Sequence, residues 1–202
     1  MWDAMWNSLA RPFASLRHPI AIAISAYALL VAVARPVSAA DDPVAKARAL
    51  ATAGKHPAAI WVLKQRLAEV PDDMDARVLL GMVLSWSERL DEARVELKKV
   101  LAVKPDHGDA LPALARVELW SKHPDRANEL ARQVLSHQPD DPEMLLLRVE
   151  ALTAMGKDSE AKSVGDRLLA VAPQSASAKT LRTRRARAAA SDDKAESAHT
   201  VN

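Results

Sequence analysis

The residues that usually carry catalysis or bind metals are few in this 202-residue chain, and they are scattered along it. The chain has no cysteine, which excludes a thiolate nucleophile, a cysteine-ligated zinc, a disulfide framework and a lipoprotein anchor. No two histidines stand four residues apart on one predicted helix, so none has metal-ligand spacing. The sequence also lacks a glycine-rich phosphate loop and a Gly-x-Ser-x-Gly nucleophile elbow. We therefore expect no enzymatic activity, no cofactor and no metal site.

Acidic residues that could otherwise form a general acid–base dyad follow prolines at a regular spacing. They are Asp72-Asp73, Asp106 and Asp140-Asp141. A carboxylate in such a place accepts hydrogen bonds from the free N–H groups of the next helix and is favoured by its positive end. We therefore interpret these acids as helix caps rather than as catalytic pairs.

The residues best suited to bind a partner are two tryptophans, Trp86 and Trp120, which stand 34 residues apart. An aromatic ring buries a large area, and it can stack on a sugar face or hold an apolar side chain. Trp61 does not share the spacing of Trp86 and Trp120, and we expect its side chain in the core. Whether Trp86 and Trp120 face a partner or pack between neighbouring segments stays open.

A period of 34 residues organises the chain after its first forty residues. Three positions of the period are each filled by one residue type in four copies: Ala59, Ala93, Ala127 and Ala161; Leu67, Leu101, Leu135 and Leu169; Pro71, Pro105, Pro139 and Pro173. Apolar residues in between have helical spacing. An Ala lets two helices cross closely, and a Pro ends the second helix. Each period therefore predicts a helix–turn–helix unit that buries its apolar face by stacking on its neighbours.

This unit resembles the tetratricopeptide repeat, which has a Leu and a small residue in its first helix, an Ala in its second and a Pro at its end. Three copies fit the first pair wholly or in part and the last copy departs from it: Leu80-Gly81, Leu114-Ala115, Lys46-Ala47 and Arg148-Val149. The resemblance implies an all-α fold, an α-solenoid of helix–turn–helix repeats wound as a right-handed superhelix.

The resemblance covers residues 41–175, which we divide into four units of about 41–73, 74–107, 108–141 and 142–175. Residues 176–190 predict a basic C-terminal capping helix, because Leu181 is its one large apolar residue. Residues 191–202 are small and polar, and we expect them to be disordered.

In tetratricopeptide arrays the first helices of the units line a concave groove, so the resemblance also implies partner-binding positions. The implied groove residues come from the second, third and fourth units: Val78, Met82, Trp86, Arg116, Trp120 and Glu150.

The composition supports helix packing and excludes some partners. The chain is 49% hydrophobic but only 3% aromatic, which favours Ala-rich helices over a β-sandwich or barrel. The net charge of +2 comes from the two ends. Residues 1–40 carry three Arg and one Asp, and residues 176–202 carry six Lys/Arg and three Asp/Glu, so residues 41–175 have a net charge of −3. The repeats therefore offer no basic surface for nucleic acid.

The first forty residues predict an export signal. A basic start is followed by the uncharged apolar run of residues 20–34 and by the small residues Ser38, Ala39 and Ala40. These are the three parts of a secretory signal peptide, 1–40, with cleavage after Ala40 or after Ala39. The alternative is a retained inner-membrane anchor, although fifteen apolar residues span only about 22 Å as a helix. Either form places the repeats in the periplasm.

The segment from Leu84 to Ala93 and the parallel Leu119-Trp120-Ser121 are similar to the periplasmic repeats of YaiO-type and exopolysaccharide-export outer-membrane proteins. The resemblance implies a scaffold or adaptor for envelope assembly or polysaccharide export. Its partner would be a protein or peptide segment, a glycan, or an outer-membrane export protein. A periplasmic chaperone-like module and a membrane-tethered subunit of a larger complex are the alternatives.

Overall fold

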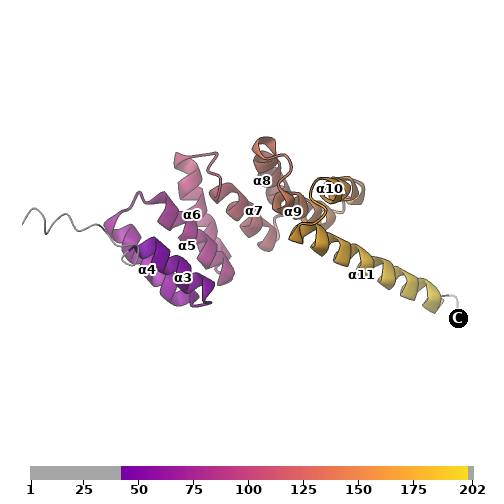
Figure 1. Cartoon of the computed structure of the whole chain (residues 1–202), viewed down its shortest axis with the longest axis horizontal. Coiled ribbons are helices and arrows are strands. Elements are labelled where there is room, and N and C mark those ends of the chain that lie inside the picture. Colours follow the sequence, from indigo (N-terminus) through magenta and orange to yellow (C-terminus); the bar gives the residue numbers. More distant parts are fainter. Residues whose placement is uncertain (1–41, 200–202) are drawn as a thin grey trace, which may run out of the picture. The chain divides into compact units, whose positions relative to one another are not determined.

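The computed structural model describes residues 42–199, so the predicted signal peptide of residues 1–40 lies outside the described residues (Figure 1). Within residues 42–199 the regular structure consists of helices alone. The helices are α3 (Pro43–Thr52), α4 (His56–Glu69), α5 (Met74–Trp86), α6 (Leu90–Val103), α7 (Ala110–Trp120), α8 (Pro124–His137), α9 (Pro142–Ala154), α10 (Asp158–Val171) and α11 (Ala176–His199). None of the helices in this part of the chain is both long and apolar enough to span a bilayer.

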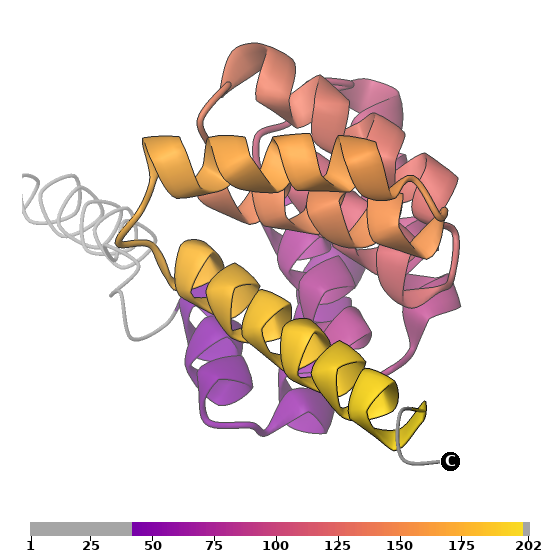
Figure 2. The same ribbon diagram turned by 90° about the vertical axis from the view of Figure 1, so that its right-hand side faces the viewer.

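The helices form consecutive pairs, as the 34-residue period predicts. Helices α3 and α4, α5 and α6, α7 and α8, and α9 and α10 pack against each other within their pairs. The second helix of each pair also contacts the first helix of the next pair, and successive first helices touch. Figures 1 and 2 show this stacking of pairs along the described part of the chain. The prediction of an all-α solenoid of helix–turn–helix units is confirmed.

The repeated alanines lie where the predicted helix crossing requires small side chains. Ala59, Ala93 and Ala127 have no exposed surface, and Ala161 is 5% exposed. Each second helix ends two residues before its proline, because proline cannot continue the hydrogen-bonded spiral. A close approach of α5 and α6 also depends on Gly81, where a Cβ atom would lie 2.6 Å from Cγ of Leu97.

Two of the predicted acidic caps are present. The backbone N–H of Ala76 donates to Asp73 at 2.9 Å, and the N–H groups of Glu143 and Met144 donate to Asp141 at 2.9 Å. Burial raises the pKa of Asp73. The bonds from Ala76 and from the Arg66 guanidinium, the latter at 2.7 Å, outweigh that effect and lower this pKa below its ordinary value.

The predicted cap at Asp106 is wrong, because α7 begins only at Ala110. The position of Asp73 and Asp141 in the period is filled here by His107, whose Nδ1 accepts one long hydrogen bond, of 3.3 Å, from the N–H of Asp109, and Gly108 follows it. Glycine disfavours a helix, so the first turn of α7 starts later than in α5 and α9.

The last helix differs from the sequence prediction in length. Helix α11 runs to His199, whereas we expected a helix ending at residue 190 and disorder in residues 191–202. Alanine, lysine and glutamate in this stretch are strong helix formers, which supports its continuation. Ala178 and Leu181 are buried against α9 and α10. Helix α11 thus takes the position of the first helix of a fifth pair (Figure 2).

Candidate functional site

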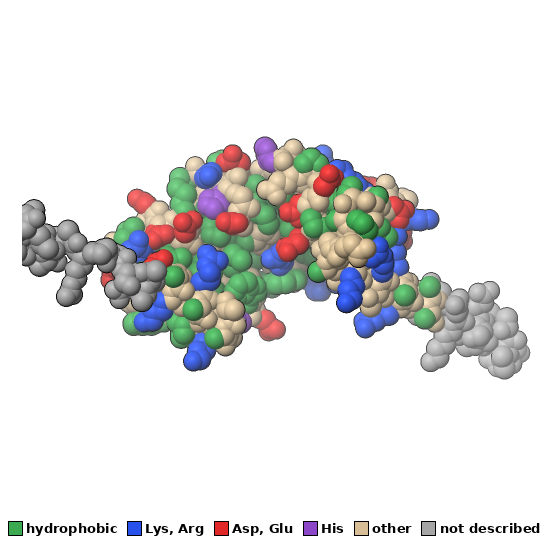
Figure 3. Space-filling view, in the orientation of Figure 1, with side chains coloured by type: hydrophobic (Ala, Val, Ile, Leu, Met, Phe, Trp, Pro, Cys, Tyr) green, Lys and Arg blue, Asp and Glu red, His purple; other side chains and the backbone are tan. Residues whose placement is uncertain are grey.

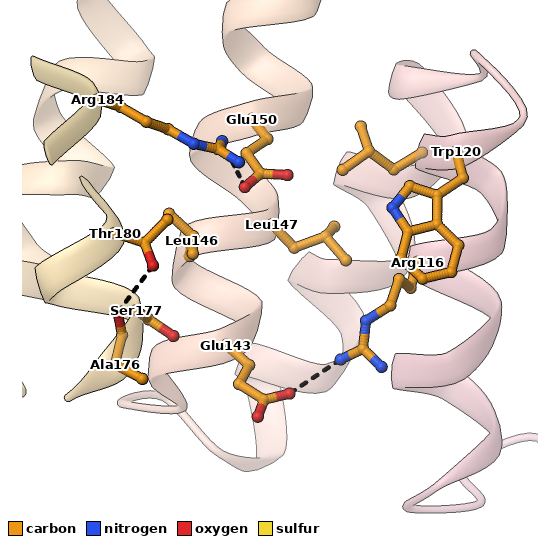
Figure 4. A pocket seen from close by; sticks show the side chains of 11 residues that line it. Arg116, Trp120, Glu143, Leu146, Leu147, Glu150, Ala176, Ser177, Thr180 and Arg184 are labelled. Atoms are coloured by element: carbon orange, nitrogen blue, oxygen red, sulfur yellow. Dashed lines mark hydrogen bonds and ion pairs between the residues drawn. The ribbon is translucent and has the colours of Figure 1, made fainter. Parts of the chain in front are cut away.

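A cavity of about 400 Å³ lies between α7, α9 and α11. Three of the six predicted groove residues, Arg116, Trp120 and Glu150, line it together. Figure 4 shows Arg116 and Trp120 on one helix facing the side chains of the next two first helices. The repeat positions these residues, because the first helices α7, α9 and α11 stack directly on one another.

Two ion pairs cross this cavity from one first helix to the next. The Arg116 guanidinium donates to Glu143 at 2.9 Å, and Arg184 lies 2.5 Å from Glu150 (Figure 4). These pairs are partly exposed, so each contributes at most about 1 kcal/mol to stability. They do, however, leave the cavity with no net charge while supplying both hydrogen-bond donors and acceptors.

The floor and one wall of the cavity are apolar. Leu147 is buried, Leu119 and Leu146 are partly buried, and the Trp120 side chain is 44% exposed. A second cavity of about 420 Å³ shares Trp120 with the first one and also includes Lys122. Trp120 is therefore open to solvent at two hollows of the surface, and a ligand can reach its ring.

The predicted groove residues of the second unit are arranged differently, and none of them lines the α7–α9–α11 cavity. Val78 is 5% exposed and belongs to the core, because its register on α5 turns it toward the neighbouring helices, so it offers little surface to a partner. Met82 packs partly buried against the same core. Trp86 is 40% exposed, and its ring lies 6.1 Å from that of His56.

The exposure of the tryptophans partly answers whether Trp86 and Trp120 face a partner or pack between repeats. Trp86 and Trp120 are both about half-exposed, so neither is buried between repeats. Trp61, which we expected in the core, is 63% exposed and lies on the outer face of α4. Val95 and Val103 are exposed in the same way on α6. The periodicity identifies the helix of each tryptophan but not the degree to which its neighbours cover it.

Four cavity residues on α11 are absent from the predicted groove, namely Ala176, Ser177, Thr180 and Arg184. They were missed because residues 176–190 lack the Ala and Pro of the repeat and were assigned a capping role alone. The signal was the period itself, since 34 residues separate Arg184 from Glu150 and Thr180 from Leu146.

A buried charged cluster between the second and third pairs was also missed. Glu118 is 1% exposed, and it accepts from Arg94 at 2.9 Å and lies 2.9 Å from Nδ1 of His123. Burial lowers the pKa of Arg94, but the carboxylates of Asp91 and Glu118 outweigh it and raise that pKa above its ordinary value. A Glu at a position filled elsewhere by Leu84 and Leu152 was the signal in the sequence. The cluster ties two repeats together.

The described part of the chain has no group of three His, Asp or Glu side chains arranged to hold a metal ion. The hydrogen bonds, ion pairs and apolar surface of the α7–α9–α11 cavity suit non-covalent binding.

Three solved structures are similar to this chain in fold. The chain is 20% identical to MamA over 61% of its own length and 67% of that protein, with a TM-score of 0.57. A tetratricopeptide repeat protein from Parabacteroides merdae is 18% identical, over 69% of this chain and 56% of that one, with a TM-score of 0.60. A thermophilic repeat protein of Thermus thermophilus is 17% identical, over 65% of this chain and 73% of that one, with a TM-score of 0.58. At these identities the likeness is one of fold.

No curated protein matches the chain significantly. The tetratricopeptide repeat family matches residues 50–117 and 118–185, which together make up more than half of the sequence. Those residues include the end of α3, helices α4 to α10 and the first part of α11. The chain belongs to the tetratricopeptide repeat family.

Proposed function

We propose that this protein is a non-enzymatic scaffold that binds an extended segment of a partner protein in the cavity between α7, α9 and α11. The observation that carries the proposal is the half-exposed Trp120, which lies in the same cavity as the ion pairs Arg116–Glu143 and Arg184–Glu150. Tryptophan and arginine are the residues that most often dominate binding energy at protein interfaces.

The cavity supports a peptide because it combines apolar surface with paired donors and acceptors. An apolar side chain of the partner would pack on Trp120 and Leu146, removing apolar area from water. The guanidinium and carboxylate groups would hydrogen-bond the carbonyl and N–H groups of the partner's backbone. A cavity of about 400 Å³ has room for one or two side chains rather than for a folded domain.

We further propose that the protein works in the bacterial periplasm, as an adaptor of an envelope assembly or polysaccharide export system. The support is the sequence of residues 1–40 and the likeness of Leu84–Ala93 to periplasmic export repeats. N-terminal sequencing of the protein from a periplasmic fraction should begin at Asp41 or Ala40. A start at Met1 would favour the membrane-tethered form instead.

A glycan is the second candidate for the cavity. An exposed indole ring stacks on sugar faces, and the flanking carboxylates, guanidiniums and hydroxyls match sugar hydroxyls. Isothermal titration of the protein with envelope oligosaccharides separates the two candidates, because a glycan ligand would bind without any partner protein present.

The cavity is tested by comparing partner capture from envelope extracts by the wild-type chain and by three variants. Trp120→Ala and Arg116→Ala are expected to reduce capture of the same partner by about tenfold, since each removes a side chain from the cavity. Trp61→Ala is the matched control, because it removes an exposed tryptophan outside the cavity. Capture that survives in a folded Trp120→Ala variant, or that is lost in Trp61→Ala, contradicts the proposed site.

A further inference from the structure

The turn inside each helix pair holds one residue in the left-handed region of the backbone. These four residues lie 34 apart, and their φ angles are similar: 71° at Gly54, 61° at Glu88, 64° at Lys122 and 71° at Gly156. The turns of the first and last pairs use glycine, which adopts this conformation freely. The turns of the two central pairs use Glu and Lys, whose Cβ atoms make it unfavourable.

Helices α5 and α7 also end in tryptophan at the equivalent position two residues before Glu88 and Lys122. The first and last pairs have Thr52 and Ala154 at the positions of Trp86 and Trp120. A strained charged residue and a half-exposed tryptophan therefore occur together in the two central pairs and are both missing from the outer pairs. Strain that is retained in this way is typical of positions whose side chains are used.

The structure gives these charged side chains no internal role. Within residues 42–199, the side chains of Glu88 and Lys122 form no ion pair or hydrogen bond, and both residues are exposed. Lys122 lines the cavity of about 420 Å³ beside Trp120. Between them, the buried hydroxyl of Ser121 has no hydrogen-bond partner, whereas the equivalent Ser87 donates to Val83 O at 2.9 Å.

From this coincidence we infer a second docking surface, the turn edge, formed by Trp86, Glu88, Trp120 and Lys122. Its occupant is an extended protein segment with two apolar side chains against the indoles, a basic side chain near Glu88 and an acidic one near Lys122. The opposite charges of Glu88 and Lys122 set this pattern. The inference rests on the proposed function in that the partner is a protein and Trp120 belongs to both surfaces, whereas Glu88 and Lys122 lie outside the α7–α9–α11 cavity.

The separation of helices α5 and α7, which carry the two tryptophans, sets the spacing expected in the partner. Helices α5 and α7 pack against each other, and packed helix axes lie about 8–10 Å apart. In a polyproline II segment, residues three apart share one face and are separated by about 9 Å. The turn edge therefore fits the order basic–apolar–x–x–apolar–acidic.

The test uses three blocked hexapeptides and the full chain, with binding followed by tryptophan fluorescence. The peptides are Lys-Leu-Pro-Pro-Leu-Glu, its doubly basic form ending in Lys and its doubly acidic form beginning with Glu. The wild type should prefer the mixed peptide about threefold to fivefold, the range of exposed ion pairs. Glu88→Lys should transfer that preference to the doubly acidic peptide, and Lys122→Glu to the doubly basic one.

Two variants separate the turn edge from the α7–α9–α11 cavity. The double variant Glu88→Gly, Lys122→Gly relieves the strain, so it should remain folded while losing the discrimination among the peptides. Arg116→Ala should leave peptide discrimination unchanged, whatever it does to capture of the envelope partner. Equal binding of all three peptides to the wild type, no binding at millimolar concentration, or unchanged discrimination in the double glycine variant would each overturn the inference.

Discussion

The first two helix pairs and the last two share one backbone plan but differ in what their first helices expose. In α3–α6 the side chains build one continuous apolar core that reaches into α7, and Val78 is part of it. In α7–α11 the core is divided into two smaller clusters, and the first helices leave a cavity crossed by two ion pairs. Basic side chains gather over the first part of α11, beside this cavity (Figure 3). The backbone plan of the repeat is thus constant, while the side chains that its first helices expose differ between the two halves.

The largest expected effect tests the continuous apolar core of helices α3–α6. Leu97 is fully buried between α5 and α6, so Leu97→Ala should lower the free energy of unfolding by about 3 to 4 kcal/mol. The equivalent residue of the third pair is Ala131, also fully buried, and Ala131→Leu should cost about 1 to 3 kcal/mol by overpacking. Urea denaturation measures both. Similar small losses for the two variants would show that the two halves are not packed as the structure describes.

The next effect tests the charged cluster at the junction of the halves. Glu118→Ala removes the buried one of the two carboxylates that pair with the guanidinium of Arg94 and leaves only the exposed Asp91, and it should destabilise the protein by about 3 kcal/mol. The double variant Glu118→Leu, Arg94→Leu removes both charges and should recover most of that loss. If the double variant is no more stable than Glu118→Ala, the cluster does not act as a pair.

Acidification should weaken the first half through Asp73 and Glu96. Burial raises the pKa of Glu96, but hydrogen bonds from Lys99 and Arg77 outweigh it and lower that pKa, as occurs at Asp73. A carboxyl group whose pKa is lowered in the folded protein stabilises the fold when the pH lies above its pKa in the unfolded chain, which is near 3.8 for Asp and 4.5 for Glu. That stability is lost as the pH falls through the folded pKa. The melting temperature should therefore fall below about pH 4.5, and by less in Asp73→Ala, which has already lost about 1 kcal/mol of capping at neutral pH.

The smallest effect concerns the turns. Glu88→Gly or Lys122→Gly relieves about 1 to 2 kcal/mol of left-handed strain but adds about 0.4 to 1 kcal/mol of unfolded-state entropy. Each variant should therefore be more stable by about 0.5 kcal/mol. Gly54→Ala and Gly156→Ala are the matched controls and should each be less stable by about 1 kcal/mol. Thermal unfolding of all four checks the signs; a loss of stability in the glycine variants would mean that the central turns are not strained.

Much of the fold could be predicted because its determinants are local and repeated. The Ala and Pro positions specify the helix crossing and the end of each pair by sterics alone. Arg148 stands where the repeat has Leu, and its role could not be predicted because it depends on another helix: its guanidinium donates to Asn128 at 3.1 Å. The burial of Val78 and the exposure of Trp61 depend on how closely neighbouring helices pack, which the period does not encode.

The candidate site was predictable in part for the same reason. The period brought Arg116, Trp120 and Glu150 to one face, because stacked first helices repeat their orientation. The contribution of α11 was not predicted, since Thr180 and Arg184 keep the spacing of the repeat without its identifying residues.

The central claim, that the α7–α9–α11 cavity binds a partner segment, is tested most directly by site-specific photocrosslinking in cells. A benzoylphenylalanine at Thr180 lies in the cavity, and one at Val103 lies on an exposed surface of α6 outside it. The account predicts a discrete crosslinked protein from Thr180 that is lost when Trp120→Ala is added, and no such product from Val103. The same product from both positions, or a product from Thr180 that persists with Trp120→Ala, would contradict it.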